Sequence, residues 1–288
     1  MLFRSSYDRR EVKPDGTVHM LFRNPDRKQP APVDQTVGVV AFRTTENEPL
    51  ATLVHFACHS VIFGGENQKY SADYSGALCA QVEDEIGGTC VFLQGAAGDV
   101  NPYTRATPDG EGYARLRESG KSLGKDVVRI MDSMETIPED EYVLTALSYT
   151  TELDHRFDLK SPDVKEFYIS RYGEDYYNSH LENLTKYTTV ETPILLVGKS
   201  IAWVGFPGEF FDDFQVDLKK RSPIPHTFFL GYCNGLHSYF PTIQAASEGG
   251  YGASYATYVE VGAGEWLVDR AVITLHTLVG NLKPHPVQ

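Results

Sequence analysis

The 288-residue sequence has no apolar run that approaches the roughly 18 residues needed to cross a bilayer. Its longest apolar runs are short stretches such as 194–197, so we expect no transmembrane segment. The first ten residues reach charged side chains almost at once and lack the apolar region of a signal peptide. No export signal is therefore visible, and the sequence leaves the compartment unknown.

Basic residues and cysteines are also scarce. The chain has 26 Lys and Arg against 39 Asp and Glu, and its formal net charge of −13 repels phosphate backbones. We therefore expect no nucleic-acid partner. The four cysteines have no C-x-x-C spacing and are too few for a disulfide framework. We expect them to be small buried apolar residues.

The compact motifs of common enzyme classes are missing: H-E-x-x-H, G-x-S-x-G, the Walker A loop and the dinucleotide-binding fingerprint. Any active site must then be assembled from segments that lie far apart in the chain. What the sequence does have is 41% hydrophobic residues, including 17 Tyr and 15 Phe, which indicates a folded protein with a substantial core.

The order of predicted elements indicates an α/β fold. Residues 36–102 are expected to form a β-hairpin, a helix that starts near Asp73, a strand at 90–93 and a Gly-rich loop. Later segments predict a helix over 116–134 that ends before Pro138, a strand over 142–151 and a helical or irregular stretch at 154–189. They are followed by a hairpin that turns at 198–199, a helix from Phe210 and a final helix over 266–278. No repeat or linker divides residues 1–288, so we expect one domain with a mixed β-sheet core and flanking helices.

Polar residues that follow predicted strands are the first site candidates, because α/β sheets bind ligands at strand ends. His59 follows a buried run and suits a metal ligand or a general base, although a core histidine bonded to a carbonyl is the alternative. The loop 95–102 could form an oxyanion-binding nest, with Asp99 and Asn101 supplying a carboxylate and an amide. The alternative is a tight turn before Pro102.

Two aromatic-rich segments supply further candidates. Glu209 lies among apolar residues after a strand, so it is either an acid in the first turn of a helix or a ligand that points into a cleft. Tyr239 could donate a hydrogen bond or bind a metal as phenolate, and its alternative is an aromatic residue at the rim of a site.

Four groups of segments together form a recognisable pattern. They are Phe56-Ala57-Cys58-His59-Ser60 followed by Ser71-Ala72-Asp73-Tyr74, then Gly98-Asp99-Val100-Asn101-Pro102, Phe206-Pro207-Gly208-Glu209-Phe210, and Gly231-Tyr232-Cys233-Asn234-Gly235 through Tyr239-Phe240-Pro241-Thr242 to Glu248-Gly249-Gly250-Tyr251. In their order and content, these segments resemble the neutral/alkaline ceramidase family, zinc amidohydrolases that cleave the amide bond of ceramide, and the resemblance covers nearly the whole chain. It implies that Zn²⁺ is held by His59, Glu209 and Tyr239, and that Arg9 binds the acyl-derived oxygens of the substrate.

The chain departs from the family pattern at two points. Asn101 stands where the family has a serine, and since Asn has no hydroxyl it could only orient a zinc-bound water or donate to an oxyanion. Asp99 would then shape the same catalytic loop. The family also takes a zinc-binding histidine from a Thr-His-Thr-His-Ser type segment upstream, which has no counterpart here, so we expect an N-terminally truncated domain.

The resemblance thus implies a zinc-dependent amidohydrolase that acts on ceramide or a related N-acyl substrate, a small lipid-like molecule. The alternative is a non-catalytic, degenerate ceramidase-like binding module, inactive because one metal histidine and the family serine are absent. The sequence leaves the acyl chain, the amine and the oligomeric state open.

Overall fold

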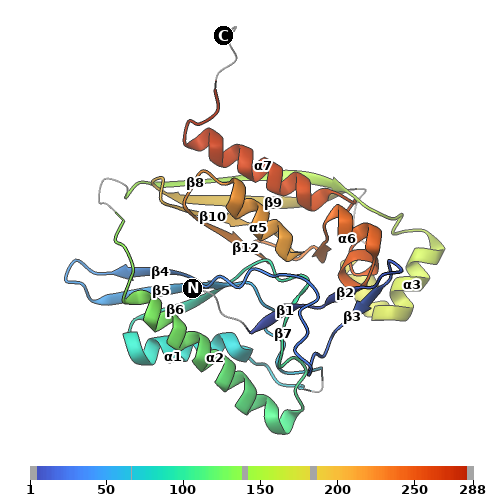
Figure 1. The fold of residues 1–288 in the computed structure, drawn as a ribbon. Helices are drawn as coiled ribbons and strands as arrows, with labels where there is room; N and C mark the ends of the chain where they lie inside the picture. Colours follow the sequence, from blue (N-terminus) through green and yellow to red (C-terminus); the bar gives the residue numbers. More distant parts are fainter. Residues whose placement is uncertain (1–4, 66, 138–141, 182–186, 284–288) are drawn as a thin grey trace.

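Two β-sheets lie face to face between two layers of helices (Figure 1). The computed structural model describes residues 5–65, 67–137, 142–181 and 187–283. This arrangement confirms the predicted α/β class with a mixed-sheet core and flanking helices. The strands divide into two main sheets, with three short strand pairs beside them. Within the described ranges, no helix is both long enough and apolar enough to cross a membrane.

The first sheet contains β4 (Gly38–Arg43), β5 (Pro49–Phe56) and β6 (Thr89–Gln94). β4 and β5 form the predicted antiparallel hairpin, and β6 adds parallel to β5. The helices α1 (Asp73–Ile86) and α2 (Asp109–Met131) pack together on its outer face. α2 ends earlier than predicted, and Pro138 lies outside the described residues.

The second sheet has the strand order β12-β10-β9-β8. The antiparallel hairpin of β9 and β10 confirms the predicted turn, although this turn spans residues 198–200 and is one residue longer than expected. Helices α5 and α7 cover the sheet on its outer side (Figure 1). The elements are β8 (Leu144–Asp154), β9 (Tyr187–Val197), β10 (Ile201–Gly205), β12 (His226–Leu230), α5 (Asp212–Arg221) and α7 (Ala263–Leu278).

Three short strand pairs and four short helical segments fill the side of the molecule beside the two sheets. β1 pairs with β7, β2 with β3, and β11 with β13. The stretch expected to be helical or irregular contains α3 and α4. The elements are β1 (Ser6–Asp8), β2 (Arg10–Val12), β3 (Val18–Met20), β7 (Val100–Pro102), β11 (Glu209–Phe210), β13 (Tyr239–Phe240), α3 (Pro162–Tyr172), α4 (Glu174–His180), α6 (Ile243–Glu248) and the π-helix η2 (Tyr251–Tyr255).

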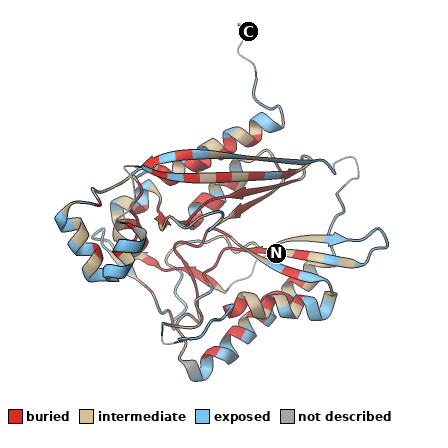
Figure 2. Ribbon diagram, turned by 180° about the vertical axis from the view of Figure 1, so that it is seen from behind, coloured by how far each residue is buried: buried red, intermediate tan, exposed pale blue. Residues whose placement is uncertain are grey.

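Apolar packing holds the layers together at three levels. One core lies between the second sheet and its helices, and another lies between the first sheet, α1 and α2. A smaller cluster joins the two sheets, where the rings of Trp203 and Phe228 stack at 5.9 Å against Leu53 and Leu93. The strands and inner loops are mostly buried, whereas the outer helices alternate between buried and exposed residues (Figure 2). All four cysteines are free thiols; Cys58 and Cys90 are buried, as predicted, and the other two are half-buried.

The loop after β6 lies directly against β11, and Gly98 makes this approach possible. The Gly98 N–H donates to the Phe210 carbonyl at 2.7 Å. A Cβ at position 98 would lie 2.5 Å from the Glu209 carbonyl oxygen and 2.8 Å from that of Phe210. Because such contacts are far inside van der Waals distance, only glycine fits between the two segments.

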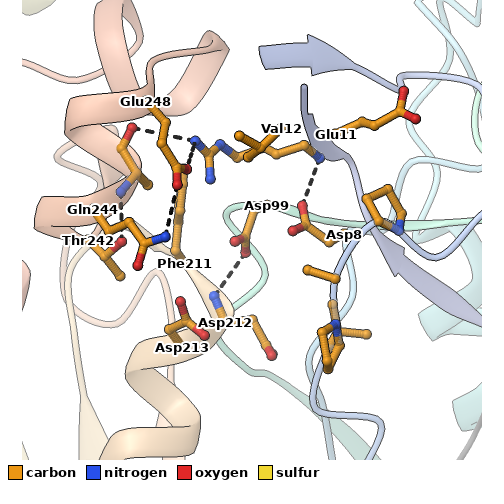
Figure 3. Close-up of a pocket in the computed structure, with 16 residues that line it drawn as sticks. Asp8, Glu11, Val12, Asp99, Phe211, Asp212, Asp213, Thr242, Gln244 and Glu248 are labelled. Carbon is orange, nitrogen blue, oxygen red and sulfur yellow. Dashed lines mark hydrogen bonds and ion pairs between the residues drawn. The ribbon is translucent and has the colours of Figure 1, made fainter. Parts of the chain in front are cut away.

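Behind this loop is an acidic cavity of about 200 Å³, lined by Asp8, Asp99, Asp212 and Asp213 (Figure 3). The Asp99 carboxylate accepts the Asp212 N–H at 2.9 Å, and Asp8 accepts the Arg10 N–H at 2.7 Å. Burial and then the neighbouring Asp99 charge raise the pKa of Asp8 from 3.8 to about 7. Burial likewise raises the pKa values of Asp99 and Asp212.

We predict that Gly98→Ala destabilises the protein by roughly 1–3 kcal/mol, because the new methyl group must push β11 away from the loop. The matched control is Gly110→Ala in the exposed first turn of α2, where a Cβ meets nothing within 4 Å. That change should leave stability equal or up to about 1 kcal/mol higher. Urea unfolding of both variants measures the difference, and equal stability of the two would contradict the close approach.

We also predict that Asp8→Asn stabilises the protein at pH 8 by about 1–3 kcal/mol and has little effect at pH 4. The pKa of Asp8 is higher in the folded protein than in the unfolded chain, so folding favours the protonated carboxyl. Its contribution to the free energy of unfolding is fully present below about pH 4 and is lost as the pH rises through about 7. Asparagine keeps an oxygen that can accept the Arg10 N–H. Thermal unfolding at both pH values measures the effect.

The control for Asp8→Asn is Asp26→Asn, which removes the same charge from an exposed position. Its melting temperature should move little at either pH. A gain of equal size in both variants at pH 8 would mean that net charge, and not burial of Asp8, causes the effect.

Candidate functional site

The parallel pairing of β11 with β13 brings Glu209 beside Tyr239. Successive residues of a strand point to opposite sides, so the next pair, Phe210 and Phe240, faces the other way. Their rings stack in the core with centroids 4.2 Å apart and planes within 8°. The buried Phe pair therefore orients the Glu209 and Tyr239 side chains toward the opposite side, where they line a cavity.

The sequence allows Glu209 to be either an acid in the first turn of a helix or a ligand that points into a cleft. The structure corrects the first reading, because Glu209 is in strand β11 and helix α5 begins only at Asp212. The predicted helix start near Phe210 is thus two residues early. The Glu209 carboxylate therefore lies outside helix α5 and lines the cavity.

His59 lies in the loop after β5, and its imidazole ring is held at both nitrogens. Nδ1 is 2.9 Å from the Val100 carbonyl oxygen, and Nε2 is 2.9 Å from Oε2 of Glu209. The backbone N–H of His59 donates to the same carbonyl at 3.2 Å. The two readings of this histidine are therefore combined: it is bonded to a backbone carbonyl, and it also faces a carboxylate in the cavity.

These contacts specify where a proton or a metal can bind. A carbonyl oxygen only accepts, so the proton of a neutral His59 ring is on Nδ1 and the lone pair of Nε2 faces Glu209. Two lone pairs at 2.9 Å repel unless a positive charge, either a second ring proton or a metal ion, lies at or between them. An imidazole whose Nδ1 donates to a backbone carbonyl is the usual arrangement of a metal-binding histidine.

The tyrosines around the carboxylate complete its surroundings. Burial raises the pKa of Glu209. The hydrogen bond and positive charge of a His59 ring that carries both protons, the Tyr239 hydrogen bond and the Arg9 charge outweigh burial, and the net pKa is lowered. Burial raises the pKa of both Tyr239 and Tyr232. The Tyr232 hydroxyl lies 3.4 Å from Nε2 of His59. Imidazole nitrogen, carboxylate and phenol oxygen are donor types that suit zinc.

Metal binding would depend on a tyrosine. In the part of the chain that the structure describes, no three His, Cys, Asp or Glu side chains come close enough together to hold a metal ion. Of the described residues around the cavity, His59 is the one histidine and Glu209 is the one carboxylate. The donor set fits a metal ion through these two side chains, with Tyr239 as the third donor.

Arg9 enters the same cavity from the turn between β1 and β2. Its N–H donates to the Asp99 carbonyl at 2.8 Å, and its Nη2 donates to the Gly98 carbonyl at 2.6 Å. The guanidinium carbon is 5.5 Å from the centre of the Tyr239 ring and 5.6 Å from that of Tyr251, and the residue is 4% exposed. Arg9 is therefore a buried cation fixed beside Glu209 and Tyr239.

The structure brings four of the six predicted site residues together around one cavity of about 410 Å³: Arg9, His59, Glu209 and Tyr239. The other two do not line this cavity. Asp99 lines the acidic cavity behind the loop. Asn101 is fully buried in β7, opposite Tyr7. A side-chain contact with Asn101 lowers the pKa of Tyr7 against the larger effect of burial, but the geometry of this contact is poor and the amide atoms have no well-aligned partner among the described residues.

The cavity also contains residues that sequence reasoning did not select, namely Phe22, Val61, Arg105, Tyr232 and Tyr251. Tyr232 and Tyr251 fall within the segments that carry the family resemblance, so that resemblance could have found them. Arg105 follows β7 in a loop without periodicity, and no sequence signal pointed to it.

No protein-family model matches the sequence, and no curated protein does. Among solved structures, the fold is similar to that of neutral ceramidase from Pseudomonas aeruginosa, with a TM-score of 0.68 and 18% identity over 99% of this chain and 52% of that chain. A structure of a ceramidase complexed with C2 gives a TM-score of 0.71 and 16% identity over 99% of this chain and 53% of that chain.

The chain thus spans about half the length of these two proteins. The resemblance expected from the sequence segments is confirmed at the level of structure. At these identities the likeness establishes the fold, and the chain has the fold of a neutral ceramidase over nearly all of its residues.

Proposed function

We propose that this chain is a zinc-dependent amidohydrolase that cleaves the amide bond of ceramide or a related N-acyl substrate. The observation that carries the proposal is the contact between His59 Nε2 and Glu209 at 2.9 Å, with Tyr239 beside them, in a cavity of about 410 Å³. The similarity of the fold to the ceramidase structures supports it.

His59, Glu209 and Tyr239 would hold the zinc ion. When bound, zinc supplies a Lewis acid that polarises a carbonyl group and lowers the pKa of a coordinated water. The residues of the chain do the rest. The Val100 carbonyl fixes the His59 ring so that Nε2 faces the cavity, and the Phe210 and Phe240 stack holds the carboxylate and the phenol in place.

Arg9 is the residue that would bind the acyl oxygen of the substrate. Its Nε has no hydrogen-bond partner among the described residues, although it is buried. In amide hydrolysis, water adds to the carbonyl carbon, the C–N bond breaks, and a carboxylate and an amine leave. A fixed guanidinium stabilises the negative charge that grows on the acyl oxygen and then the product carboxylate.

We also propose that Asn101 orients water or donates to the oxyanion, although its side chain is fully buried and does not line the cavity. What supports this role is its place in β7 beside the residue that holds the His59 ring. A buried amide without well-aligned hydrogen bonds lowers the stability of the folded protein by about 1–3 kcal/mol. Such unfavourable arrangements are found mainly at functional sites. Asn101 directly follows Val100, whose carbonyl bonds to His59, so a small rotation of this strand would move both residues together.

We predict that the chain purified without chelator holds about one zinc ion, and that His59→Ala and Glu209→Gln each remove most of it because each removes a strong donor. Elemental analysis by mass spectrometry gives the zinc content. Hydrolysis of a fluorescent short-chain ceramide and of N-dodecanoylethanolamine gives the activity, which should fall at least about 100-fold in both variants.

The matched control is His19→Ala, since His19 is an exposed histidine in β3 that does not line the cavity. It should keep both zinc and activity. Absence of zinc in the parent chain would refute the metal site, and zinc without turnover of any amide would support the alternative, a ceramidase-like binding module.

We predict that Asn101→Ala lowers kcat at least about 10-fold while it changes the free energy of unfolding by less than about 1 kcal/mol. Removal of a poorly bonded amide offsets most of the small void that it leaves. Steady-state kinetics and urea unfolding measure the two effects. Unchanged kcat would remove Asn101 from the proposed catalytic groups.

A further inference from the structure

Among the described residues, two arginines line the cavity, and the proposed hydrolysis gives a role to one of them, Arg9. Arg105 extends from the loop after β7 and borders the same cavity as Arg9. Its Nη1 donates to the Phe22 carbonyl at 3.0 Å, and its guanidinium carbon lies 5.0 Å from the centre of the Phe22 ring. Arg9 lies 5.7 Å from the centre of that ring, so one aromatic side chain contacts both cations.

Arg105 has no counter-ion among the described residues. Its charged neighbours include two further arginines, Arg9 and Arg23, and both the burial of Arg105 and the Arg9 charge lower its pKa. The one carboxylate among the described lining residues, Glu209, already faces His59. A half-buried guanidinium beside a second one is unfavourable unless an anion is bound between or near them.

The charge of the cavity is thus opposite to that of the whole chain. The chain carries a net charge of −13, yet two guanidinium groups and one carboxylate line this cavity. A zinc ion at His59 and Glu209 would make it more positive. An uncharged amide such as ceramide would leave Arg105 unpaired, whereas a substrate with a carboxylate would pair with it through two parallel N–H···O bonds.

We propose that Arg105 binds a carboxylate of the substrate, and that the preferred substrate is an N-acyl amino acid or a similar carboxylate-bearing lipid amide. This inference rests on the proposed amide hydrolysis, for which it names the substrate class. In an N-acylglycine, the carboxylate is separated from the scissile carbonyl by one nitrogen and one methylene. The guanidinium carbons of Arg9 and Arg105 lie 5.7 Å and 5.0 Å from the centre of the Phe22 ring, so we assign the acyl oxygen to Arg9 and the nearby carboxylate to Arg105.

The test compares N-dodecanoylglycine with N-dodecanoylethanolamine, which has a hydroxymethyl group in place of the carboxylate. Isothermal titration measures binding to the full chain, and steady-state kinetics measures hydrolysis. The carboxylate compound should bind at least about 10-fold more tightly. Arg105→Gln should abolish this preference and raise KM for N-dodecanoylglycine about 10- to 100-fold with kcat nearly unchanged, because the contact is made equally in substrate and transition state.

Two further variants isolate the role of the side chain. Arg105→Lys keeps the charge but loses the planar pair of donors, so it should restore part of the preference. Arg43→Gln removes a charge from an exposed strand end outside the cavity and should leave the preference intact. A monoamide of dodecanedioic acid with ethanolamine places the carboxylate on the acyl side, and preference for it over N-dodecanoylglycine would overturn the assignment to the amine side.

The binding measurement separates this inference from the proposed function. If the carboxylate compound binds more tightly and this difference depends on Arg105, the inference is supported even when no amide is hydrolysed. In that case the proposed function alone fails. Equal binding of the two compounds, or no binding of either, overturns the inference even if ceramide is hydrolysed.

Discussion

The site depends on the pairing of two dipeptides, Glu209–Phe210 with Tyr239–Phe240. One residue of each dipeptide is polar and one is an apolar aromatic, so the alternation of a strand separates them to opposite sides. Burial of the two Phe rings stabilises the pairing by the hydrophobic effect. The free energy gained from this burial also holds a carboxylate next to a phenol and a buried cation. Without it, these polar groups would be more stable when exposed to water.

A single loop separates two cavities of opposite charge. The Gly98 carbonyl faces Arg9 in one cavity, while the Asp99 carboxylate accepts a hydrogen bond from Asp212 in the other. Burial disfavours the charged form of Arg9, and its neighbours Tyr239 and Glu209 favour it, with a smaller contribution from the Asp99 charge across the loop. The charge of Arg9 thus depends mainly on groups within its own cavity.

The sequence predicted the long elements because apolar runs and helical periodicity extend over enough residues to identify them. It also pointed, mainly through resemblance, to His59, Glu209, Tyr239 and Arg9, which line one cavity in the structure. β11 and β13 contain two residues each, too few to show a strand periodicity, so the sequence leaves open whether Glu209 belongs to a strand or to the first turn of a helix. Arg105 lies in a loop whose partner, Phe22, is 83 residues away along the chain, and no local pattern encodes such a contact.

The charge distribution also constrains how an anionic substrate could reach the cavity. At a net charge of −13, the chain repels an anion at long range, and this repulsion is screened beyond about 10 Å at 0.1 M salt. The attraction of Arg9 and Arg105 acts at short range in a partly desolvated cavity, where salt weakens it less. Selectivity for an anion would then come mainly from slow dissociation and only little from fast association. An apolar acyl chain that packs on Phe22 and Tyr251 would add to the same slow dissociation, because its burial is independent of charge.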